Sequence, residues 1–249
     1  QLKTVLEEFQ PEIINHHAAQ INVRHSVENP AEDCEINALG LINLMEAARS
    51  QNVKKVIFAS SGGAIYGEQQ NFPADENHPT EPASPYGITK LISEKYLDFY
   101  QQTYGIPSVI LRYANVYGPR QNPHGEAGVI AIFLQKMLRG ETVSINGDGL
   151  QTRDYVFVAD VVAANALALQ EGVSGVYNIG TGVETSVWDI FNTLAAELNY
   201  SQEPASGPAQ LGEQRRSVLS TAKIKSAMGW EARYSLKDGI QGIIKLISE

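Results

Sequence analysis

A tyrosine and a lysine stand four residues apart in the segment Ser-Pro-Tyr-Gly-Ile-Thr-Lys at 84–90. Ser84 can cap a helix whose first position is Pro85, where the missing N–H is harmless. Tyr86 and Lys90 are therefore expected on one face of the first helical turns. A phenol with a pKa of about 10 is a poor base at neutral pH, and a neighbouring ammonium favours its phenolate form. The pair could serve as a general base, although an ordinary surface Tyr and Lys fit the same spacing.

Two serines and two glycines follow an apolar run at 53–59, in the segment Ala-Ser-Ser-Gly-Gly-Ala-Ile-Tyr-Gly at 59–67. Hydroxyl groups at the carboxyl end of a parallel strand lie where open α/β sheets bind ligands. The glycines allow the backbone to approach a ligand closely. Ser60 and Ser61 are thus candidates for contact with a reacting group. An ordinary strand-to-loop turn is equally compatible with these residues alone.

The elements that must position these residues can be predicted from apolar spacing. Short apolar runs at 12–16, 53–59, 108–114 and 175–179 alternate with helical patterns at 31–50 and 85–104. Near-continuous apolar strands are typical of parallel sheets covered on both faces. We therefore predict an α/β fold with a doubly wound (Rossmann) parallel sheet. Beyond residue 118, we expect short strands at 142–146 and 154–158 and helices at 129–139, 161–170, 187–198, 221–228 and 236–247.

The composition restricts the class of protein. The 249 residues carry a net charge of −9 and a pI of about 5.1, which argues against a nucleic-acid polymer as partner. No apolar run approaches the roughly 20 residues of a membrane span, and the charged first residues are unlike a signal peptide. The single cysteine, Cys34, excludes an intramolecular disulfide and suits a cytoplasmic location.

The order Ser, Tyr, Lys resembles the catalytic triad of short-chain dehydrogenases, and the resemblance extends over nearly the whole chain. Further matching segments are 13–20, Asn-Ala-Leu-Gly at 37–40, Leu-Arg-Tyr-Ala-Asn-Val-Tyr-Gly-Pro at 111–119, Gly-Asp-Gly at 147–149, Arg-Asp-Tyr-Val at 153–156 with Val158 and Asp160, and Asn-Ile-Gly at 178–180. Together they resemble the extended short-chain dehydrogenase/reductases. Within that group, they are most similar to the UDP-glucose 4-epimerase-like members of the NAD-dependent epimerase/dehydratase family.

This resemblance implies NAD as the cofactor and the epimerisation of a nucleotide sugar, with a UDP-hexose as the expected substrate. Tyr86 would remove a sugar hydroxyl proton while NAD⁺ takes hydride from the same carbon, and hydride would return to the other face of the keto intermediate. Lys90 would lower the pKa of Tyr86 and hold the nicotinamide ribose. Ser61, or Ser60 if the register differs by one, would hydrogen-bond the reacting oxygen.

The resemblance also implies two sets of binding residues. Those expected to bind the cofactor are His17, Ala18, Ala19, Gln20, Asn37, Ala59, Ser60, Tyr86, Lys90, Tyr113 and Ala114. Those expected to bind the substrate are Ser61, Asn115, Arg153, Gln210, Glu213 and Ser217.

The domain organisation follows from the same resemblance. Residues 1–118 are interpreted as the remainder of an NAD-binding Rossmann domain, 158–180 as a return to it, and 119–249 mainly as a smaller substrate-binding cap. The family begins with a strand–Gly-x-x-Gly-x-x-Gly–helix unit that binds the pyrophosphate, and no such segment occurs here. A first βαβ unit and its next helix need roughly 60 residues. We therefore expect the sequence to be part of a longer protein.

A second departure lies at Gln-Leu-Gly-Glu, 210–213, where relatives usually carry Arg-Pro-Gly-Asp/Glu. That arginine binds a phosphate, and Gln210 cannot supply its charge. Either Arg215 or Arg216 compensates, or the ligand differs. Four residues beyond the acidic residue, Ser217 takes the position that gates the sugar pocket in the family. Because serine is small, we expect an N-acetylated UDP-hexose to be handled at least comparably to UDP-glucose.

Three other functions stay open. A 4,6-dehydratase needs an extra acid and base, which that branch carries as Asp-Glu directly after its triad Ser/Thr, where this sequence has Gly62-Gly63. A sugar-nucleotide reductase uses the same triad with a dissociable NADPH, and a catalytically silent protein of this fold would need no triad at all.

Two expectations concern assembly and metals. In the resembling family, helices corresponding to 31–50 and 85–104 pair with their symmetry mates, so we expect a homodimer. We expect no metal site, because His16 and His17 are adjacent and would face opposite sides of a strand.

Overall fold

A four-stranded parallel sheet forms the centre of the molecule, with the strand order β1-β2-β3-β8. The computed structural model describes residues 1–123, 128–209 and 214–248. The strands of this sheet are β1 (Ile13–His16), β2 (Lys55–Ser61), β3 (Ser108–Tyr113) and β8 (Gly175–Ile179). Helices connect these parallel neighbours, as a doubly wound sheet requires. The predicted α/β fold class is confirmed.

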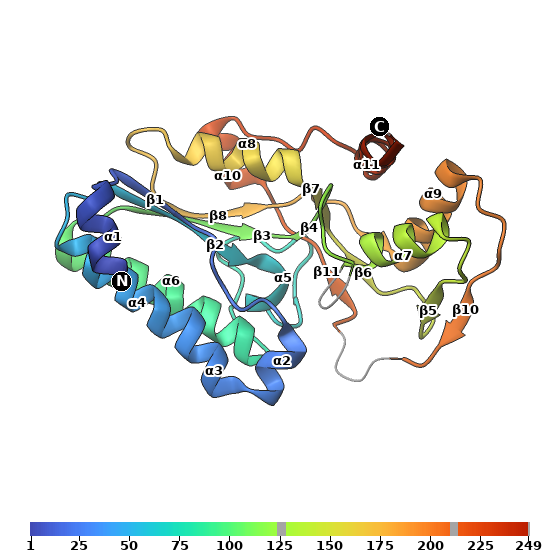
Figure 1. Ribbon diagram of the computed structural model, residues 1–249, viewed down its shortest axis with the longest axis horizontal. Helices are drawn as coiled ribbons and strands as arrows, with labels where there is room; N and C mark the ends of the chain where they lie inside the picture. Colours follow the sequence, from blue (N-terminus) through green and yellow to red (C-terminus); the bar gives the residue numbers. More distant parts are fainter. Residues whose placement is uncertain (124–127, 210–213, 249) are drawn as a thin grey trace.

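Helices cover both faces of this sheet (Figure 1). One face carries α1 (Leu2–Phe9), α4 (Gly40–Arg49) and α6 (Pro85–Tyr104). The opposite face carries α8 (Val158–Ala168) and α10 (Ala222–Met228). The strands are therefore buried from both sides.

Successive residues of β2 enter different hydrophobic clusters. Val56 and Phe58 pack in a cluster with Leu41 of α4 and Leu97 of α6, whereas Ile57 belongs to the cluster that includes residues of α8 and α10. Because successive strand side chains point to opposite faces, a strand between two helical layers is apolar at consecutive positions. This is the physical origin of the unbroken apolar run at 53–59.

The helix predicted at 31–50 contains one π-helical turn. It begins as α3 (Pro30–Cys34), continues as the π-helix η1 (Glu35–Leu39) and ends as α4. The Gly40 N–H bonds to the Glu35 carbonyl, five residues back. Such insertions are frequent at functional sites, and apolar spacing does not reveal this one.

The helix α6 has the bounds predicted from the sequence. Ser84 Oγ accepts a hydrogen bond from the Gly87 N–H at 3.2 Å, and Pro85 occupies the first turn. Gly105, at φ 69°, ends the helix in the left-handed conformation. A capped N-terminus and a glycine C-terminus are the signals that define such a helix, and they fix where its first turn begins.

Two short helices are not predicted by the sequence pattern, α2 (Val23–Glu28) and α5 (Gly62–Ile65). The helix α5 starts directly after β2 ends, at the glycine pair for which the sequence left an ordinary strand-to-loop turn open as one alternative. In α2, the buried hydroxyl of Ser26 accepts a hydrogen bond from the Tyr86 N–H at 3.1 Å. Both short helices therefore contact the beginning of α6.

A buried ion pair joins α6 to the sheet. Arg112 of β3 donates to both carboxylate oxygens of Glu94, at 3.0 and 2.6 Å. Ser60 donates to the same carboxylate at 2.6 Å, and Arg112 also donates to the Tyr66 hydroxyl at 2.9 Å. Removing one partner of a buried ion pair typically costs about 3–5 kcal/mol, so this network constrains how α6 lies on the sheet.

The second half of the chain builds a smaller group of elements beside the sheet, on the right in Figure 1. Its helices α7 (Val129–Leu138), α9 (Val187–Leu198) and α11 (Leu236–Ser248) surround their own hydrophobic cluster. Its paired strands are β4 (Asn115–Tyr117) with β7 (Tyr155–Phe157), β5 (Ser144–Asn146) with β10 (Ala205–Gly207), and β6 (Thr152–Arg153) with β9 (Thr185–Ser186) and β11 (Arg216–Ser217). α8 and β8, within 158–180, lie on the main sheet; the division into two domains stays a prediction.

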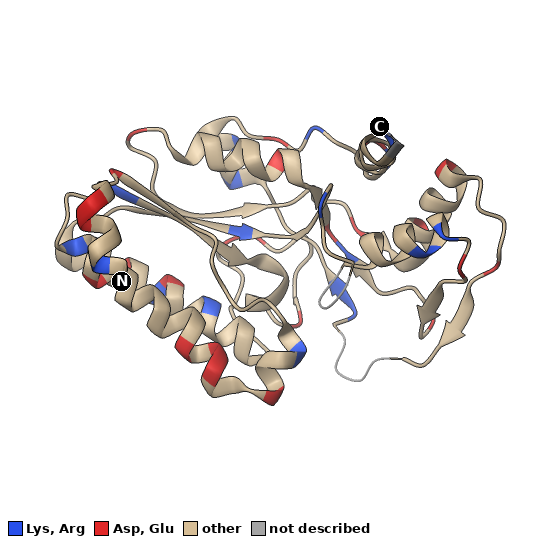
Figure 2. Cartoon of the chain, viewed as in Figure 1, with Lys and Arg blue, Asp and Glu red and all other residues tan. Residues whose placement is uncertain are grey.

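The surface charge is mixed over the drawn part of the chain. In Figure 2, lysines and arginines are interspersed with aspartates and glutamates and form no continuous basic band in the residues coloured. Among the described residues, no helix is both long and apolar enough to span a bilayer.

Candidate active site

Ser61 and Tyr86 meet at the carboxyl end of β2. Ser61 is the last residue of that strand, Tyr86 lies in the first turn of α6, and the Ser61 hydroxyl lies near enough to the Tyr86 hydroxyl to lower its pKa. A Cβ atom on Gly87 would lie 2.8 Å from the Ala64 carbonyl oxygen. Glycine at position 87 therefore allows α6 to approach α5 closely, and this approach brings the Tyr86 ring to the strand end.

Lys90 lies one turn further along α6 and is 4% exposed. Its Nζ donates to the Ala59 carbonyl at 2.9 Å and lies 4.8 Å from the Phe58 ring centroid and 5.8 Å from that of Tyr86. An ammonium group has three N–H donors, and the Ala59 carbonyl accepts one of them. The predicted spacing thus places Tyr86 and Lys90 on one helix face, against the end of β2.

The pKa values at this site differ from the simple expectation that Lys90 makes Tyr86 more acidic. Burial raises the pKa of Tyr86 to about 12; the hydrogen bond with Ser61 opposes this shift and the charge of Asp33 adds to it. Burial lowers the pKa of Lys90 to about 8, against the opposing effects of Asp33 and Glu94. Desolvation favours the neutral form of both groups. This effect outweighs the attraction between the Lys90 ammonium and the Tyr86 phenolate.

The structure distinguishes the two serines. Ser60 is 4% exposed and its hydroxyl donates to Glu94, on the side of the buried ion pair. Ser61 faces the other way, toward Tyr86, and lines a cavity of about 210 Å³. Of the two alternatives left open by the sequence, Ser61 is therefore the hydroxyl that can contact a reacting group.

Asn37 holds the loop that follows β1. Its side-chain amide forms two hydrogen bonds of 2.9 Å with the backbone of Gln20, one to the N–H and one to the carbonyl. The same amide group donates to Asp33 at 3.1 Å, and the Ser93 hydroxyl donates to the Asn37 carbonyl at 3.3 Å. Asn37 lies in the π-helical turn, so its position depends on that insertion.

The other predicted cofactor residues lie at the ends of β1 and β3. His17 Nε2 is 3.2 Å from Asn165 Oδ1, and Asn165 Nδ2 donates to the Tyr113 hydroxyl at 2.8 Å. The rings of His17 and Tyr113 are 6.1 Å apart. Asn165, on α8, was not expected from the sequence, because a polar residue on a helix that packs on a sheet carries no motif. Ala18 and Ala19 follow His17 in the same loop, and Ala114 follows Tyr113 and lines the 210 Å³ cavity.

Two cavities lie on either side of the N-terminus of α7. The first is the 210 Å³ cavity, whose lining includes Ser61, Asn115 and Gly128. The second, of about 340 Å³, is lined by Val129, Ile132, Phe133, Lys136, Ser144, Asn146, Gln151 and Val187. Gly128 caps α7 without a side-chain hydrogen bond from the described residues. The sequence did not reveal the second cavity, because its polar residues come from separate short strands and loops.

Arg153 and Ser217 are neighbours in the small sheet, where Ser217 of β11 pairs directly with Arg153 of β6. Arg153 is half-buried and its Nη1 donates to the Thr152 carbonyl at 2.8 Å. Ser217 is only 3% exposed, and Gln69 Nε2 lies 3.5 Å from its hydroxyl. The predicted substrate residues Gln210 and Glu213 lie outside the described residues.

The segment around Ser217 is tied to the loop between α5 and α6. Gln69 Oε1 accepts a hydrogen bond from the Val218 N–H at 3.0 Å. The backbone of Ala74 bonds to both Val218 and Ser220, at 3.0 and 2.8 Å. The loop that leads into the Tyr86 helix and the segment that carries Ser217 thus form one hydrogen-bonded unit.

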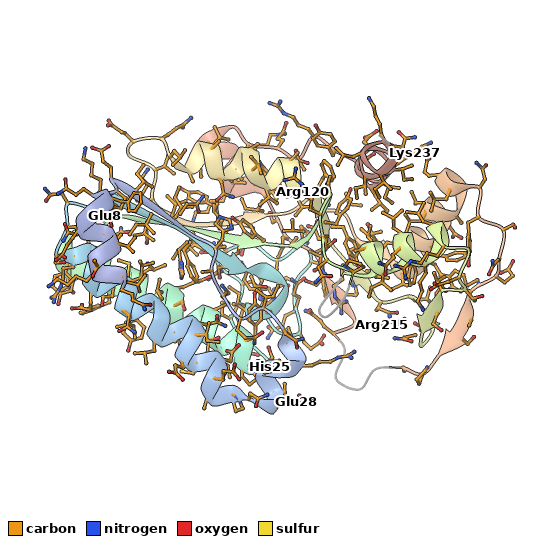
Figure 3. All side chains as sticks on the ribbon, in the orientation of Figure 1. Glu8, His25, Glu28, Arg120, Arg215 and Lys237 are labelled. Atoms are coloured by element: carbon orange, nitrogen blue, oxygen red, sulfur yellow. The ribbon has the colours of Figure 1, made fainter. Side chains whose placement is uncertain are left out.

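Arg215 and Arg216 both bind carboxylates. Arg215, labelled in Figure 3, forms two hydrogen bonds with Asp148, at 2.8 and 2.9 Å, which lower the pKa of Asp148 to about 2. Arg216 pairs with Glu184 and stacks 3.8 Å from the Phe72 ring centroid. If either arginine replaces the charge missing at 210, a phosphate must compete with its carboxylate partner.

The family of the chain follows from its similarity to known proteins. Residues 1–180 match the model of the NAD dependent epimerase/dehydratase family. The chain belongs to this family. It is 49% identical over 233 residues to a putative UDP-glucose 4-epimerase of Methanocaldococcus jannaschii, covering 94% of this chain and 76% of that protein. It is 45% identical over 240 residues to the UDP-glucose 4-epimerase of Mycolicibacterium smegmatis, covering 96% and 77%.

Solved structures agree with this assignment. The crystal structure of a UDP-glucose 4-epimerase from Thermotoga maritima with UDP-glucose superposes with a TM-score of 0.96 at 46% identity, over 100% of this chain and 82% of that one. That of Thermus thermophilus UDP-glucose 4-epimerase in complex with NAD gives 0.91 at 43%, over 98% and 80%. The predicted family, its Rossmann fold and its dependence on NAD are thereby confirmed.

The described residues fit this cofactor. Lys90 Nζ lies 5.8 Å from the Tyr86 ring centroid at the carboxyl ends of the strands, where both side chains can bind ribose hydroxyls. The small side chains of Ala18 and Ala19 leave room beside the β1 loop, which Asn37 holds.

The two serines provide a matched test of the site. We predict that Ser61→Ala lowers kcat by about 10²-fold in the full-length protein, because it removes a donor to the reacting oxygen. Ser60→Ala removes the hydrogen bond to Glu94 and should instead lower the free energy of unfolding by about 1–3 kcal/mol with little change in kcat. Steady-state kinetics and urea unfolding of both variants check this; the reverse pattern would assign the reacting hydroxyl to Ser60.

Proposed function

We propose that the full-length protein interconverts UDP-hexoses by NAD-dependent epimerisation at C4. The observation that carries this proposal is the meeting of Ser61, Tyr86 and Lys90 at the end of β2, where Lys90 Nζ donates to the Ala59 carbonyl and lies 5.8 Å from the Tyr86 ring centroid. When bound, NAD⁺ supplies the hydride acceptor and a positively charged ring that favours the phenolate of Tyr86. Tyr86 takes the proton of the 4-hydroxyl and later returns it, while Ser61 donates a hydrogen bond to the same oxygen. Lys90 stabilises the phenolate while it is protonated.

The environment of the Tyr86 hydroxyl is suited to a reversible proton transfer. Burial raises the pKa of Tyr86 even with Lys90 nearby, so the added positive charge of the bound nicotinamide ring links deprotonation to the occupied site. Between the two proton transfers the sugar is a ketone, and its ring must turn to present the other face for the returning hydride. Ser61 and Tyr86 act on the oxygen alone and leave the rest of the sugar free to rotate.

The residues after Ser61 argue against dehydration. A Cβ atom at Gly62 would lie 2.5 Å from Leu219 Cδ1, and one at Gly63 would lie 3.4 Å from Asn115 Oδ1. Neither glycine offers an acid or a base, and position 62 has no room for one without movement of Leu219. The chain is also 32% identical to human dTDP-D-glucose 4,6-dehydratase, but positions 62 and 63 carry neither an acid nor a base.

The nucleotide fits the two cavities beside α7. Asn115 lines the cavity that Ser61 opens into, and the N-terminus of α7 after Gly128 suits the diphosphate, because helix N-termini favour anions. Beyond this N-terminus, the hydroxyl of Ser144 and the amide of Asn146 in the 340 Å³ cavity can hydrogen-bond a base. In this order, the sugar would lie beside Tyr86.

A homodimer is part of the proposal. The outer face of α6 is apolar and hollowed by about 480 Å³ at Leu91, Ile92, Lys95, Tyr96 and Phe99. On the neighbouring helix, Ile36 and Leu39 are 44% and 47% exposed. Contiguous exposed apolar surface marks interaction sites, and these two helices are the pair expected to meet their symmetry mates. The cytoplasmic location stays a prediction.

Tyr86→Phe tests the activity itself. We predict that purified full-length protein converts UDP-glucose to UDP-galactose, and that Tyr86→Phe lowers kcat by about 10²–10⁴-fold with unchanged thermal stability. Chromatographic separation of the two nucleotide sugars measures the conversion. A loss of less than about tenfold would remove Tyr86 from the proton-transfer role. Mass analysis of the nicotinamide nucleotide that copurifies separates this function from a reductase, which would release NADP.

Phe99→Glu tests the dimer. Phe99 is 47% exposed in the hollow on α6, and a charge there should convert the dimer to a monomer at micromolar concentration. Val162→Glu on α8, where the side chain is 61% exposed, is the matched control. A monomeric molar mass of the wild-type protein in light scattering would contradict the dimer.

Ser217→Tyr tests the sugar gate. Ser217 is buried beside Gln69 and next to Arg153, so a bulky side chain must enter the space around it. We predict that Ser217→Tyr depresses kcat/KM for UDP-N-acetylglucosamine by at least about tenfold more than for UDP-glucose. An equal effect on both sugars would show that Ser217 does not gate the pocket.

A further inference from the structure

Asp33 is a fully buried carboxylate between the two helices that carry the site residues. It lies on α3, has 0% exposure, and accepts hydrogen bonds from neutral groups. Gln20 Nε2 donates to Oδ1 at 2.7 Å, Asn37 Nδ2 donates to Oδ1 at 3.1 Å, and the Thr89 hydroxyl donates to Oδ2 at 2.6 Å. Burial of a carboxylate is costly unless its charge is balanced, and these three donors bring no charge.

The three partners lie in three parts of the site whose relative positions must be fixed. Gln20 ends the loop predicted to contact the cofactor, Asn37 lies in the π-helical turn, and Thr89 directly precedes Lys90 on α6. One carboxylate therefore joins the loop after β1, the π-helical turn and the first turns of α6. A hydrogen bond of 2.6–2.7 Å to a carboxylate is short and strong, so Asp33 fixes their relative positions.

The charge of Asp33 also acts on Lys90. The charged and titratable groups that surround Lys90 are Asp33 from α3, His16 from β1, and Tyr86 and Glu94 from α6 itself. Glu94 is already paired with Arg112 by two hydrogen bonds.

We propose that Asp33 is a positioning residue of the reaction: it holds the cofactor loop against the first turns of α6 and balances the buried charge of Lys90. The proposal rests on the function proposed above, in which Lys90 acts as a cation beside Tyr86. Burial lowers the pKa of Lys90 to about 8, and Asp33 is the largest opposing cause. The same charge raises the pKa of Tyr86. Without it, both groups would titrate at lower pH.

Asp33→Asn separates the charge from the hydrogen bonds. The amide oxygen can still accept from Gln20 and Asn37, and the Thr89 hydroxyl can rotate to accept from the new NH₂ group. That hydroxyl then has the Tyr86 carbonyl, 3.0 Å away, as its own acceptor. The substitution thus removes the charge and leaves every partner satisfied.

The first measurement is a titration of Lys90 in the protein without substrate. We expect the ¹³Cε signal of Lys90, assigned by its loss in Lys90→Arg, to titrate about one pH unit lower in Asp33→Asn than in wild type. Glu32→Gln is the matched control: it removes the same charge one residue away, where the side chain is 54% exposed and pairs with His25. Glu32→Gln should leave the midpoint of the Lys90 titration at its wild-type pH. An unchanged Lys90 midpoint in Asp33→Asn would overturn the proposal.

The second measurement is the pH profile of kcat/KM for UDP-glucose in the full-length protein. Both limbs should move to lower pH by about one unit in Asp33→Asn and stay in place in Glu32→Gln. A uniform loss of rate with an unmoved profile would make Asp33 merely structural. If the wild type is inactive but the Lys90 midpoint still shifts in Asp33→Asn, the proposed function is overturned and the effect of Asp33 on Lys90 stands.

Asp33→Ser is a second neutral variant, smaller and with a hydroxyl that can bond to Thr89. It should reproduce the shift of Lys90 if Asp33→Asn does not fold. Failure of both variants to fold, judged by circular dichroism, would overturn the proposal, because it would assign Asp33 to the stability of the helix pair.

Discussion

The position of Tyr86 depends on one backbone contact, the approach of Gly87 to the Ala64 carbonyl, which leaves no space for a Cβ atom. α5 follows directly on Ser61. Because α6 packs against α5, the distance of α6 from the end of β2 is fixed. The distance between the hydroxyls of Ser61 and Tyr86 is a consequence of this contact. A larger residue at 87 would lift the helix, and Lys90, one turn on, would move with it.

Apolar packing alone would leave α6 free to rotate or slide, because the hydrophobic effect has no direction. Two buried carboxylates remove that freedom. Glu94 binds Arg112 and Ser60 of the sheet, and Asp33 of the neighbouring helix binds Thr89. Hydrogen bonds in a desolvated interior are directional and costly to leave unmade. Both faces of the Tyr86 helix are therefore located by polar groups, and the apolar clusters supply the bulk of the burial.

Much of this site could be predicted from the sequence, and the missing parts have physical reasons. The bounds of α6 follow from Ser84, Pro85 and Gly105, which act locally, and the strands follow from apolar runs. The choice between Ser60 and Ser61 could not be made, because a shift of one residue reverses which side of a strand a side chain faces. The π-helical turn has no periodic signal of its own.

Long-range polar contacts were equally hidden in the sequence. Asp33 and Asn165 matter through partners on other elements, and a lone polar residue in a helix does not reveal whether it is buried. The direction of the Tyr86 pKa shift was also wrong when argued from charge alone, because the degree of desolvation is a property of the folded chain.

The bond between Gln69 and Val218 joins positions 149 residues apart, and this separation has a consequence for synthesis on the ribosome. Ser61, Tyr86 and Lys90 all leave the ribosomal exit tunnel long before Val218 does. Domains fold as units during translation, starting from the N-terminal side, and non-local pairings form slowly. Because Leu219 and Ile224 belong to the same hydrophobic cluster as Ile57 of β2, the strand that ends at Ser61 is fully covered only after the segment that carries Ser217 has been made. The strand β11 and the following Val218 are synthesised late, and the pocket is complete only when Val218 has bonded to Gln69 in the loop between α5 and α6.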